Sequence, residues 1–118
     1  MILSFQDKAP HLGKSVYIAE TADVIGDVIL KDYVNIWFGA VIRGDMHFIR
    51  IDSRSNIQDN AVVHVTTAVS PTHIGSGVTV GHGAIIHGCT IKDNCMIGMG
   101  ATVMDDAVIG TGSLIGAG

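Results

Sequence analysis

The sequence predicts an all-β fold, a single-stranded parallel β-helix built from hexapeptide repeats. Aliphatic residues recur every six positions, beginning with Ile18, Val24, Leu30, Ile36 and Ile42. The chain also contains 15 glycines in 118 residues, and no window keeps the i, i+3, i+4, i+7 apolar spacing of an amphipathic helix. A fixed six-residue period is typical of solenoids whose coils are made of flat faces.

Each repeat accounts for one face of a coil. The branched residue fills a narrow interior, and a following glycine such as Gly98 or Gly110 permits a tight corner. Three faces form a coil of about 18 residues, and stacked coils pair their backbones at roughly 4.8 Å. We therefore expect one domain over 1–118, with an N-terminal cap segment at 1–15 and coils over 16–118.

The apolar register runs to the end of the sequence with two interruptions. After Ile42 it resumes at Ile51, Ile57, Val63, Ile74, Val80, Ile86, Ile91, Ile97, Val103, Ile109 and Ile115. The irregular spacings predict loops near 46–50 and 65–73. Loops that leave a rigid solenoid often carry functional residues.

Composition narrows the range of partners and locations. The net charge is −4, and the seven Lys and Arg residues form no basic run, which argues against nucleic acid as a partner. No 18-residue apolar span and no secretory leader are evident, so we expect no membrane association and a cytoplasmic location. Cys89 and Cys95 occupy small-residue positions of their repeats, which predicts buried, free, structural thiols.

Three histidines fall at informative positions of the repeat. If the second interruption is an excursion within one repeat, Ile86 stacks on Val63 one coil later. His64 and His87 each follow one of these residues, so both point outward from one face about 4.8 Å apart. Two imidazoles so placed can converge on one metal ion.

His82 lies near the preceding corner, five residues before His87 along an extended path. It is therefore poorly placed to complete the site within its own chain. A neighbouring subunit related by a three-fold axis could supply it and leave one coordination position open for water. We interpret His64, His82 and His87 as a metal site rather than as three solvated surface residues.

Four segments together resemble the gamma-class carbonic anhydrase family. They are 36–45 (IWFGAVIRGD), 56–60 (NIQDN), 63–65 (VHV) and 80–89 (VGHGAIIHGC). The resemblance implies a left-handed β-helix, a homotrimer and metal sites at subunit interfaces. It implies zinc, or alternatively Fe(II) or cobalt, held by residues matching His64, His82 and His87. The usual C-terminal helix of the family is not expected here, because the sequence stops in mid-repeat.

The resemblance also implies roles for the polar residues around the metal. Arg43 and Asp45 match an interface ion pair, and Asp59 matches a carboxylate that joins it. Gln58 matches the glutamine that orients water at the metal. The implied activity is reversible hydration of CO2 to bicarbonate. Trp37 is expected to pack at an interface.

Two positions depart from the archetypal family member. Met46 and Thr67 stand where that member carries glutamates that move protons to solvent. His47 and His73 are the candidate proton relay, because an unperturbed imidazole titrates near neutral pH.

Two other classes of function stay open on the same scaffold. One is acyl chemistry, by an acyl-CoA thioesterase that uses the same metal or by a hexapeptide acyltransferase that needs a single base histidine. The other is a non-catalytic assembly protein, which the missing glutamates favour.

Overall fold

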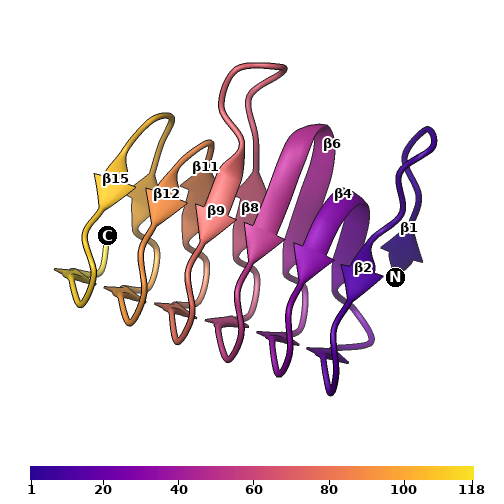
Figure 1. Cartoon of the computed structure of the whole chain (residues 1–118). Coiled ribbons are helices and arrows are strands. Elements are labelled where there is room, and N and C mark those ends of the chain that lie inside the picture. The colour runs from indigo at the N-terminus through magenta and orange to yellow at the C-terminus, as the bar shows by residue number, and fades with distance from the viewer.

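The computed structural model describes all residues 1–118 and contains β-strands but no helix. The chain winds as a parallel β-helix, with β1 and the N-terminus at one end of the stack and the C-terminus at the other (Figure 1). All pairings between named strands are parallel. The predicted all-β solenoid is confirmed. No helix is present that could span a membrane.

The first face of the β-helix is a six-stranded sheet of very short strands. In chain order they are β3 (Tyr17–Ile18), β5 (Asn35–Ile36), β7 (Asn56–Ile57), β10 (Thr79–Val80), β13 (Met96–Ile97) and β16 (Leu114–Ile115). The second residue of each strand is the aliphatic residue of the repeat. These residues align from coil to coil, as in the pairs Ile57 with Val80 and Val80 with Ile97.

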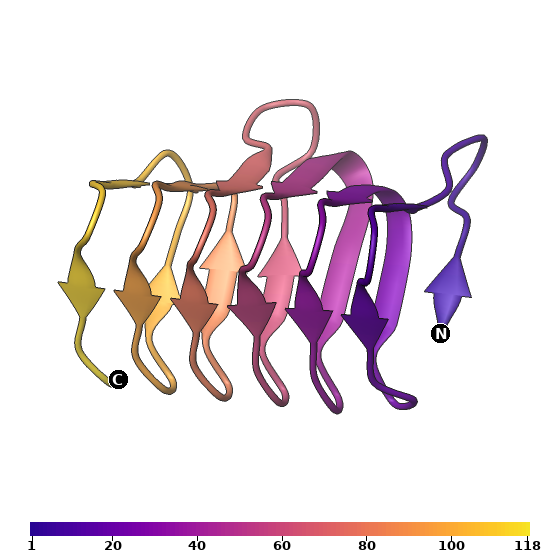
Figure 2. The ribbon, with the colours of Figure 1, turned by 60° about the horizontal axis from the view of Figure 1, so that its bottom comes forward.

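The second and third faces join into one ten-stranded sheet, because two long strands turn the corner between them (Figure 2). These strands are β4 (Asp23–Leu30) and β6 (Val41–Ile51). Their first halves lie on the second face with β1 (Ile2–Leu3), β8 (Val62–His64), β11 (Ile85–His87) and β14 (Thr102–Val103). Their second halves lie on the third face with β2 (His11–Leu12), β9 (Thr72–Ile74), β12 (Thr90–Ile91) and β15 (Val108–Ile109).

The interior is one continuous apolar column of 26 buried residues. The repeat residues from Val24 to Ile97 are at most 1% exposed, whereas Ile18, Ile109 and Ile115 near the ends are only partly buried. Because each face contributes one branched side chain per coil, every coil adds a similar layer to the column. The six-residue register that the sequence predicts is confirmed.

The prediction of a loop near 46–50 is wrong, because the chain does not leave the sheet there. These residues stay within β6, which pairs with β4 up to Gly44 and again from Ile49, with a register shift opposite Asp27. The extra residues therefore form a bulge, because the flanking backbone keeps its ladder of hydrogen bonds. Gly26 has a φ of +81°, and a Cβ there would collide with the carbonyl oxygen of Gly44. Glycine is required where the two strands come this close.

The second interruption does leave the solenoid, as the sequence predicts. The chain departs after His64, forms an antiparallel bridge between Thr66 and Ser70, and returns at Thr72. This excursion protrudes from the stack between β8 and β9 (Figure 1). We call residues 65–71 the excursion loop.

Both cysteines are buried in the interior, each 2% exposed, as the sequence predicts. Burial raises the pKa of the Cys89 thiol to about 11. A thiol with so high a pKa carries almost no thiolate near neutral pH. Cys89 therefore serves packing.

Candidate metal centre

His64 and His87 stand side by side on the second face. Strands β8 and β11 pair in the register that aligns Val63 with Ile86 and His64 with His87. The imidazole centroids are 5.1 Å apart with the rings tilted by 73°. The two side chains are 17% and 28% exposed, so both are accessible from the surface. The stacking expected from the repeat is confirmed.

Each histidine of this pair contacts a carboxylate. His64 Nε2 lies 2.9 Å from Asp45 Oδ1 on one side. His87 Nδ1 lies 2.7 Å from Asp105 Oδ1 on the other. An ionised carboxylate only accepts hydrogen bonds, so these ring nitrogens carry the hydrogen. The remaining nitrogens, Nδ1 of His64 and Nε2 of His87, have no hydrogen-bond partner in the chain.

Arg43 holds Asp45 in place from the other side. Arg43 Nη1 donates to Asp45 Oδ2 at 2.6 Å, and the backbone N–H of Met46 donates to Asp45 Oδ1 at 2.8 Å. Burial raises the pKa of Asp45, but the hydrogen bonds from His64 and Arg43 and the Arg43 charge outweigh it. The pKa therefore lies below its usual value. Asp45 is thus an anion in contact with both Arg43 and His64.

The sequence reasoning missed Asp105. This residue lies in the turn between β14 and β15, beside the strand that pairs with β11. Its pKa is held below the usual value by hydrogen bonds from the Thr66 hydroxyl and then from His87. The strand register pairs Ile86 with Val103 and ends before Asp105, so the repeat does not predict the contact between Asp105 and His87.

His82 occupies a separate hollow at the corner between the first and second faces. The hollow has a volume of about 320 Å³ and is also lined by Asn35, Trp37, Asn56, Gln58 and Asp59. His82 Nδ1 lies 3.1 Å from Asp59 Oδ2, and the His82 side chain is 54% exposed. Trp37 lines this hollow and packs against Tyr17, with the ring centroids 5.2 Å apart and the rings tilted by 50°.

One chain therefore carries the histidines in two groups. His82 lies in the turn before β11, whereas His87 is the last residue of that strand. No three His, Cys, Asp or Glu side chains within the chain are arranged to hold a metal ion. Asp59 likewise contacts His82 and not Arg43. Gln58 lies with His82, and its Nε2 donates to Asn56 Oδ1 at 3.3 Å.

Comparison with known proteins identifies the hexapeptide repeat and several relatives named as carbonic anhydrases. The family model of the bacterial transferase hexapeptide (six repeats) matches residues 71–103 and 88–118. Gamma carbonic anhydrase 2, mitochondrial, of Arabidopsis thaliana is 45% identical over 99% of this chain and 44% of its own length. The carbonic anhydrase of Geobacillus kaustophilus is 42% identical over 95% of this chain and 61% of its own length.

A solved structure agrees with these matches. The hexapeptide transferase family protein from Anaplasma phagocytophilum superimposes with a TM-score of 0.85 at 35% identity, covering all of this chain and 76% of that one. The chain belongs to the gamma carbonic anhydrase family of hexapeptide-repeat proteins. It spans about half the length of the curated relatives that it matches.

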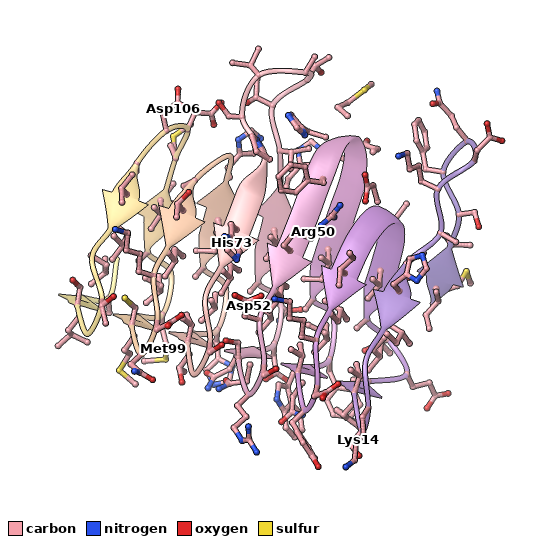
Figure 3. All side chains as sticks on the ribbon, in the orientation of Figure 1. Lys14, Arg50, Asp52, His73, Met99 and Asp106 are labelled. Atoms are coloured by element: carbon pink, nitrogen blue, oxygen red, sulfur yellow. The ribbon has the colours of Figure 1, made fainter.

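Within this family member, the two candidate relay histidines lie in different places. His47 lies in the β6 bulge and lines a small hollow together with Asp45 and Met46. His73 lies on the third face, where its Nε2 is 3.1 Å from Asp52 Oδ2 (Figure 3). The structure therefore brings His47 close to the carboxylate that contacts His64, whereas His73 belongs to a separate ion-pair cluster.

The two positions that lack glutamates lie next to each other. Met46 is 49% exposed, and its carbonyl oxygen accepts a hydrogen bond of 3.2 Å from the N–H of Ala68 in the excursion loop. Thr67 is the exposed residue just before Ala68. A carboxylate at either position would stand at the surface near Asp45.

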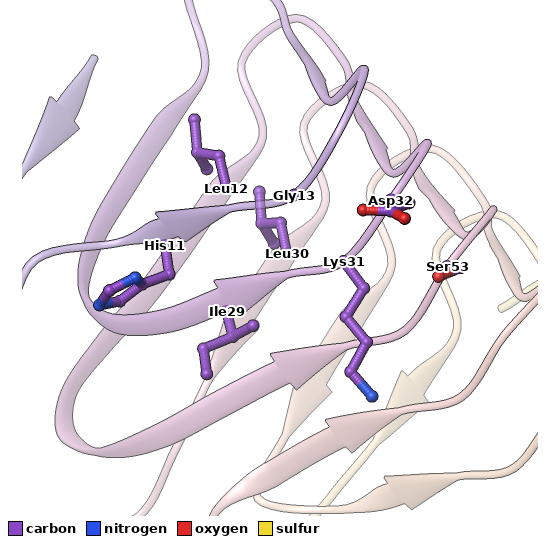
Figure 4. Close-up of a pocket in the computed structure, with 8 residues that line it drawn as sticks. All are labelled: His11, Leu12, Gly13, Ile29, Leu30, Lys31, Asp32 and Ser53. Carbon is purple, nitrogen blue, oxygen red and sulfur yellow. The ribbon is translucent and has the colours of Figure 1, made fainter.

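Another hollow, of about 460 Å³, lies elsewhere. It is lined by His11, Leu12, Gly13, Ile29, Leu30, Lys31, Asp32 and Ser53 on the N-terminal coils (Figure 4). It contains none of the candidate site residues. Lys31 and Asp32 are also engaged, since Lys31 Nζ is 2.8 Å from Asp52 Oδ1 and Asp32 Oδ1 accepts from the N–H of Lys14.

Proposed function

We propose that this protein is a metal-dependent enzyme of the carbonic anhydrase type, which reversibly hydrates CO2 to bicarbonate. The observation that carries the proposal is the alignment of His64 with His87 at 5.1 Å between ring centroids, flanked by carboxylates. The names of the relatives from Arabidopsis and Geobacillus support it. The predicted CO2 hydration remains the function that this geometry fits best.

The donor set fits a divalent metal ion. Metal-binding histidines usually donate one ring N–H to a carboxylate and present the other nitrogen to the metal. His64, His82 and His87 each have one carboxylate at a ring nitrogen. Three imidazoles suit zinc, and alternatively Fe(II) or cobalt. Such an ion supplies Lewis acidity that brings the pKa of a bound water towards 7.

We further propose that the active form is a homotrimer. His64 and His87 of one subunit would meet the hollow of a neighbour that contains His82, Gln58 and Asp59. The separation of these two groups within one chain supports this arrangement, as does the closed symmetry that most homo-oligomers adopt. Exposed Trp37 and Phe38, 36% and 47% exposed, give the corner an apolar rim suited to subunit contact.

The polar side chains around the histidines would orient water, fix a histidine ring and transfer a proton. The Gln58 amide lies on the wall of the His82 hollow, where it would orient the reacting water. Arg43 keeps Asp45 ionised, and Asp45 in turn fixes the His64 ring. His47, beside Asp45, is the relay candidate that the structure favours for passing the proton to solvent.

The test combines metal analysis with stopped-flow CO2 hydration on protein purified without oxygen. We expect about one metal ion per chain and a hydration rate that His87→Ala abolishes while the variant remains folded. His73→Ala, on the other face, serves as the control and should keep both metal and activity. A folded trimer with no metal or no hydration activity would contradict the proposal.

A second candidate function is acyl chemistry at the same site. An apolar groove of about 430 Å³ runs from His82 and Gln58 along Met96, Met99 and Leu114, and it offers room for an acyl chain. The hexapeptide transferase name of the Anaplasma relative also favours it. Metal-dependent hydrolysis of acyl-CoA, with no CO2 hydration, would select this alternative.

A further inference from the structure

His87 has a hydrogen-bond partner on the following coil, whereas His64 has its partner on the preceding one. The contact from His87 Nδ1 to Asp105 Oδ1 is 2.7 Å. This contact places the ring hydrogen on Nδ1, and the lone pair is therefore on Nε2. A metal ion requires that lone pair, so the side chain that selects the tautomer also selects the nitrogen that can bind metal.

Asp105 is itself fixed by the excursion loop. The Thr66 hydroxyl donates to Asp105 Oδ2, so both carboxylate oxygens have a partner. The Ser70 hydroxyl donates to Asp106 Oδ1 at 2.8 Å, and the N–H of Asp106 donates to the carbonyl of Gly88 at 2.8 Å. Asp106 lies next to the protruding loop in Figure 3. The loop therefore ties the 105–106 turn to the histidine strand.

Gly88 allows this turn to approach His87 so closely. It has a φ of +61°, and a Cβ at this position would lie 3.0 Å from the Asp105 carboxyl carbon and from the Ser70 side chain. The excursion loop, Gly88 and the Asp105 turn thus form one packed unit. Thr72 at the base of the loop adds to it, because its hydroxyl donates to the His64 carbonyl at 2.6 Å and accepts from the Gly88 N–H at 2.8 Å.

We infer that Asp105 is a positioning residue for the metal centre: braced by Thr66, it holds His87 in the Nδ1–H tautomer and presents Nε2 to the metal ion. The role of the metal rests on the proposed function, but the tautomer does not. The excursion loop then acts as the support of the site. Asp105 completes a set in which each of the three histidines has its own carboxylate, beside Asp45 for His64 and Asp59 for His82.

The experiment uses the full chain and two measurements. Imidazole ¹⁵N shifts of the metal-free protein, recorded near pH 8.5, report the tautomer of His87. Competition with a chelator reports the affinity for zinc. We expect Asp105→Ala to lose the Nδ1–H tautomer and to bind zinc roughly 10–100-fold more weakly. Asp105→Asn keeps a hydrogen-bond acceptor without the charge, and its zinc affinity should lie between those of the wild-type protein and Asp105→Ala.

Asp106→Asn is the matched control, because it removes the same charge one residue away and leaves His87 untouched. If Asp105→Ala does not fold, Thr66→Val tests the same inference through the brace, with a smaller loss in the same direction. An unchanged His87 tautomer in a folded Asp105→Ala protein, or an equal loss of affinity in Asp106→Asn, would overturn the inference. A wild-type protein that binds no zinc would contradict the proposed function, and the ¹⁵N shifts would still decide the role of Asp105.

Discussion

His64 and His87 are direct neighbours in the β-ladder although 22 residues separate them in the sequence. Their spacing is set by the backbone pairing of β8 and β11 and not by side-chain adjustment. The excursion loop absorbs the extra residues between Val63 and Ile74 without disturbing this register. A rigid sheet therefore holds two candidate metal ligands at a fixed distance, and the loop between them carries other contacts.

We predict that metal is shared between chains. Mixing His82→Ala chains with His64→Ala chains should restore part of the metal binding that each variant lacks, because one interface can then draw every ligand from intact positions. Metal per chain after mixing and reassembly is the measurement. A mixture of His64→Ala with His87→Ala is the control and should restore nothing, since both changes damage the same half-site. Restoration in neither mixture would contradict a shared site.

Arg43→Ala should destabilise the fold and weaken the trimer. It removes the cation that contacts Asp45 at 2.6 Å and leaves a carboxylate of which only 10% is exposed. Arg43 itself is 45% exposed, so we expect a loss of about 1 kcal/mol within a chain after solvent screening. Urea denaturation and sedimentation measure the two effects. Arg54→Ala is the control, because Arg54 contacts the Tyr33 ring and no carboxylate. Equal losses in both variants would count against a role for the ion pair.

The contribution of Asp52, which pairs with Lys31 and His73, to the free energy of unfolding should be lost in acid. Burial raises the pKa of Asp52, but hydrogen bonds from Lys31 and His73 outweigh it and bring the folded-state pKa below 3.8. The folded state thus binds the proton less tightly than the unfolded state does. The resulting stability is present above the unfolded-state pKa near 3.8 and is lost as the pH falls through the lower, folded value.

Asp52→Asn should therefore reduce the free energy of unfolding at pH 7 by about 1 kcal/mol, since Lys31 and His73 are half exposed. The deficit should shrink as the pH falls through the lowered folded-state pKa of Asp52, because wild-type Asp52 then becomes protonated as well. Urea midpoints across this range provide the measurement. Asp7→Asn, at an exposed position without an ion pair, should show no such pattern. A deficit that stays constant with pH would point to packing instead.

Cys89 should be inert in the folded protein. Its thiol has a pKa of about 11 and lies in the interior, so little thiolate is present or accessible. In a Cys95→Ala background, an aromatic disulfide reagent near pH 8 should react slowly with the native protein and rapidly in concentrated guanidinium. Fast reaction in the native state would show that this part of the coil opens.

Turnover of CO2 should be limited by proton transfer. Met46 and Thr67 offer no carboxylate, so added imidazole buffer should raise turnover severalfold while the second-order rate for CO2 changes little. Thr67→Glu should reduce this buffer dependence, because residue 67 lies at the surface beside Met46. Thr111→Glu, on a distant turn, is the control. Buffer-independent turnover would instead indicate an internal relay, and His47→Ala would then test it.

The sequence by itself determined the solenoid, its interior and the central pair of the site. One branched residue per six positions specifies a narrow column, and the position just after that residue points outward. The positions of His64 and His87 directly after Val63 and Ile86 therefore predict that the two histidines lie side by side. The same logic placed Cys89 inside. Such inferences succeed because periodic backbone pairing fixes both register and side-chain direction.

Only the tertiary structure decided what happens where the period breaks. The residues after Gly44 look like a loop in the sequence, yet they bulge within β6, because the ladder with β4 resumes on the far side. The hydrogen-bond partner of His87 was also decided by the tertiary structure. Asp105 reaches His87 from a turn that contacts Thr66 and packs closely against Gly88. Turn geometry depends on contacts between coils that no local pattern records, whereas the strand register repeats with every coil.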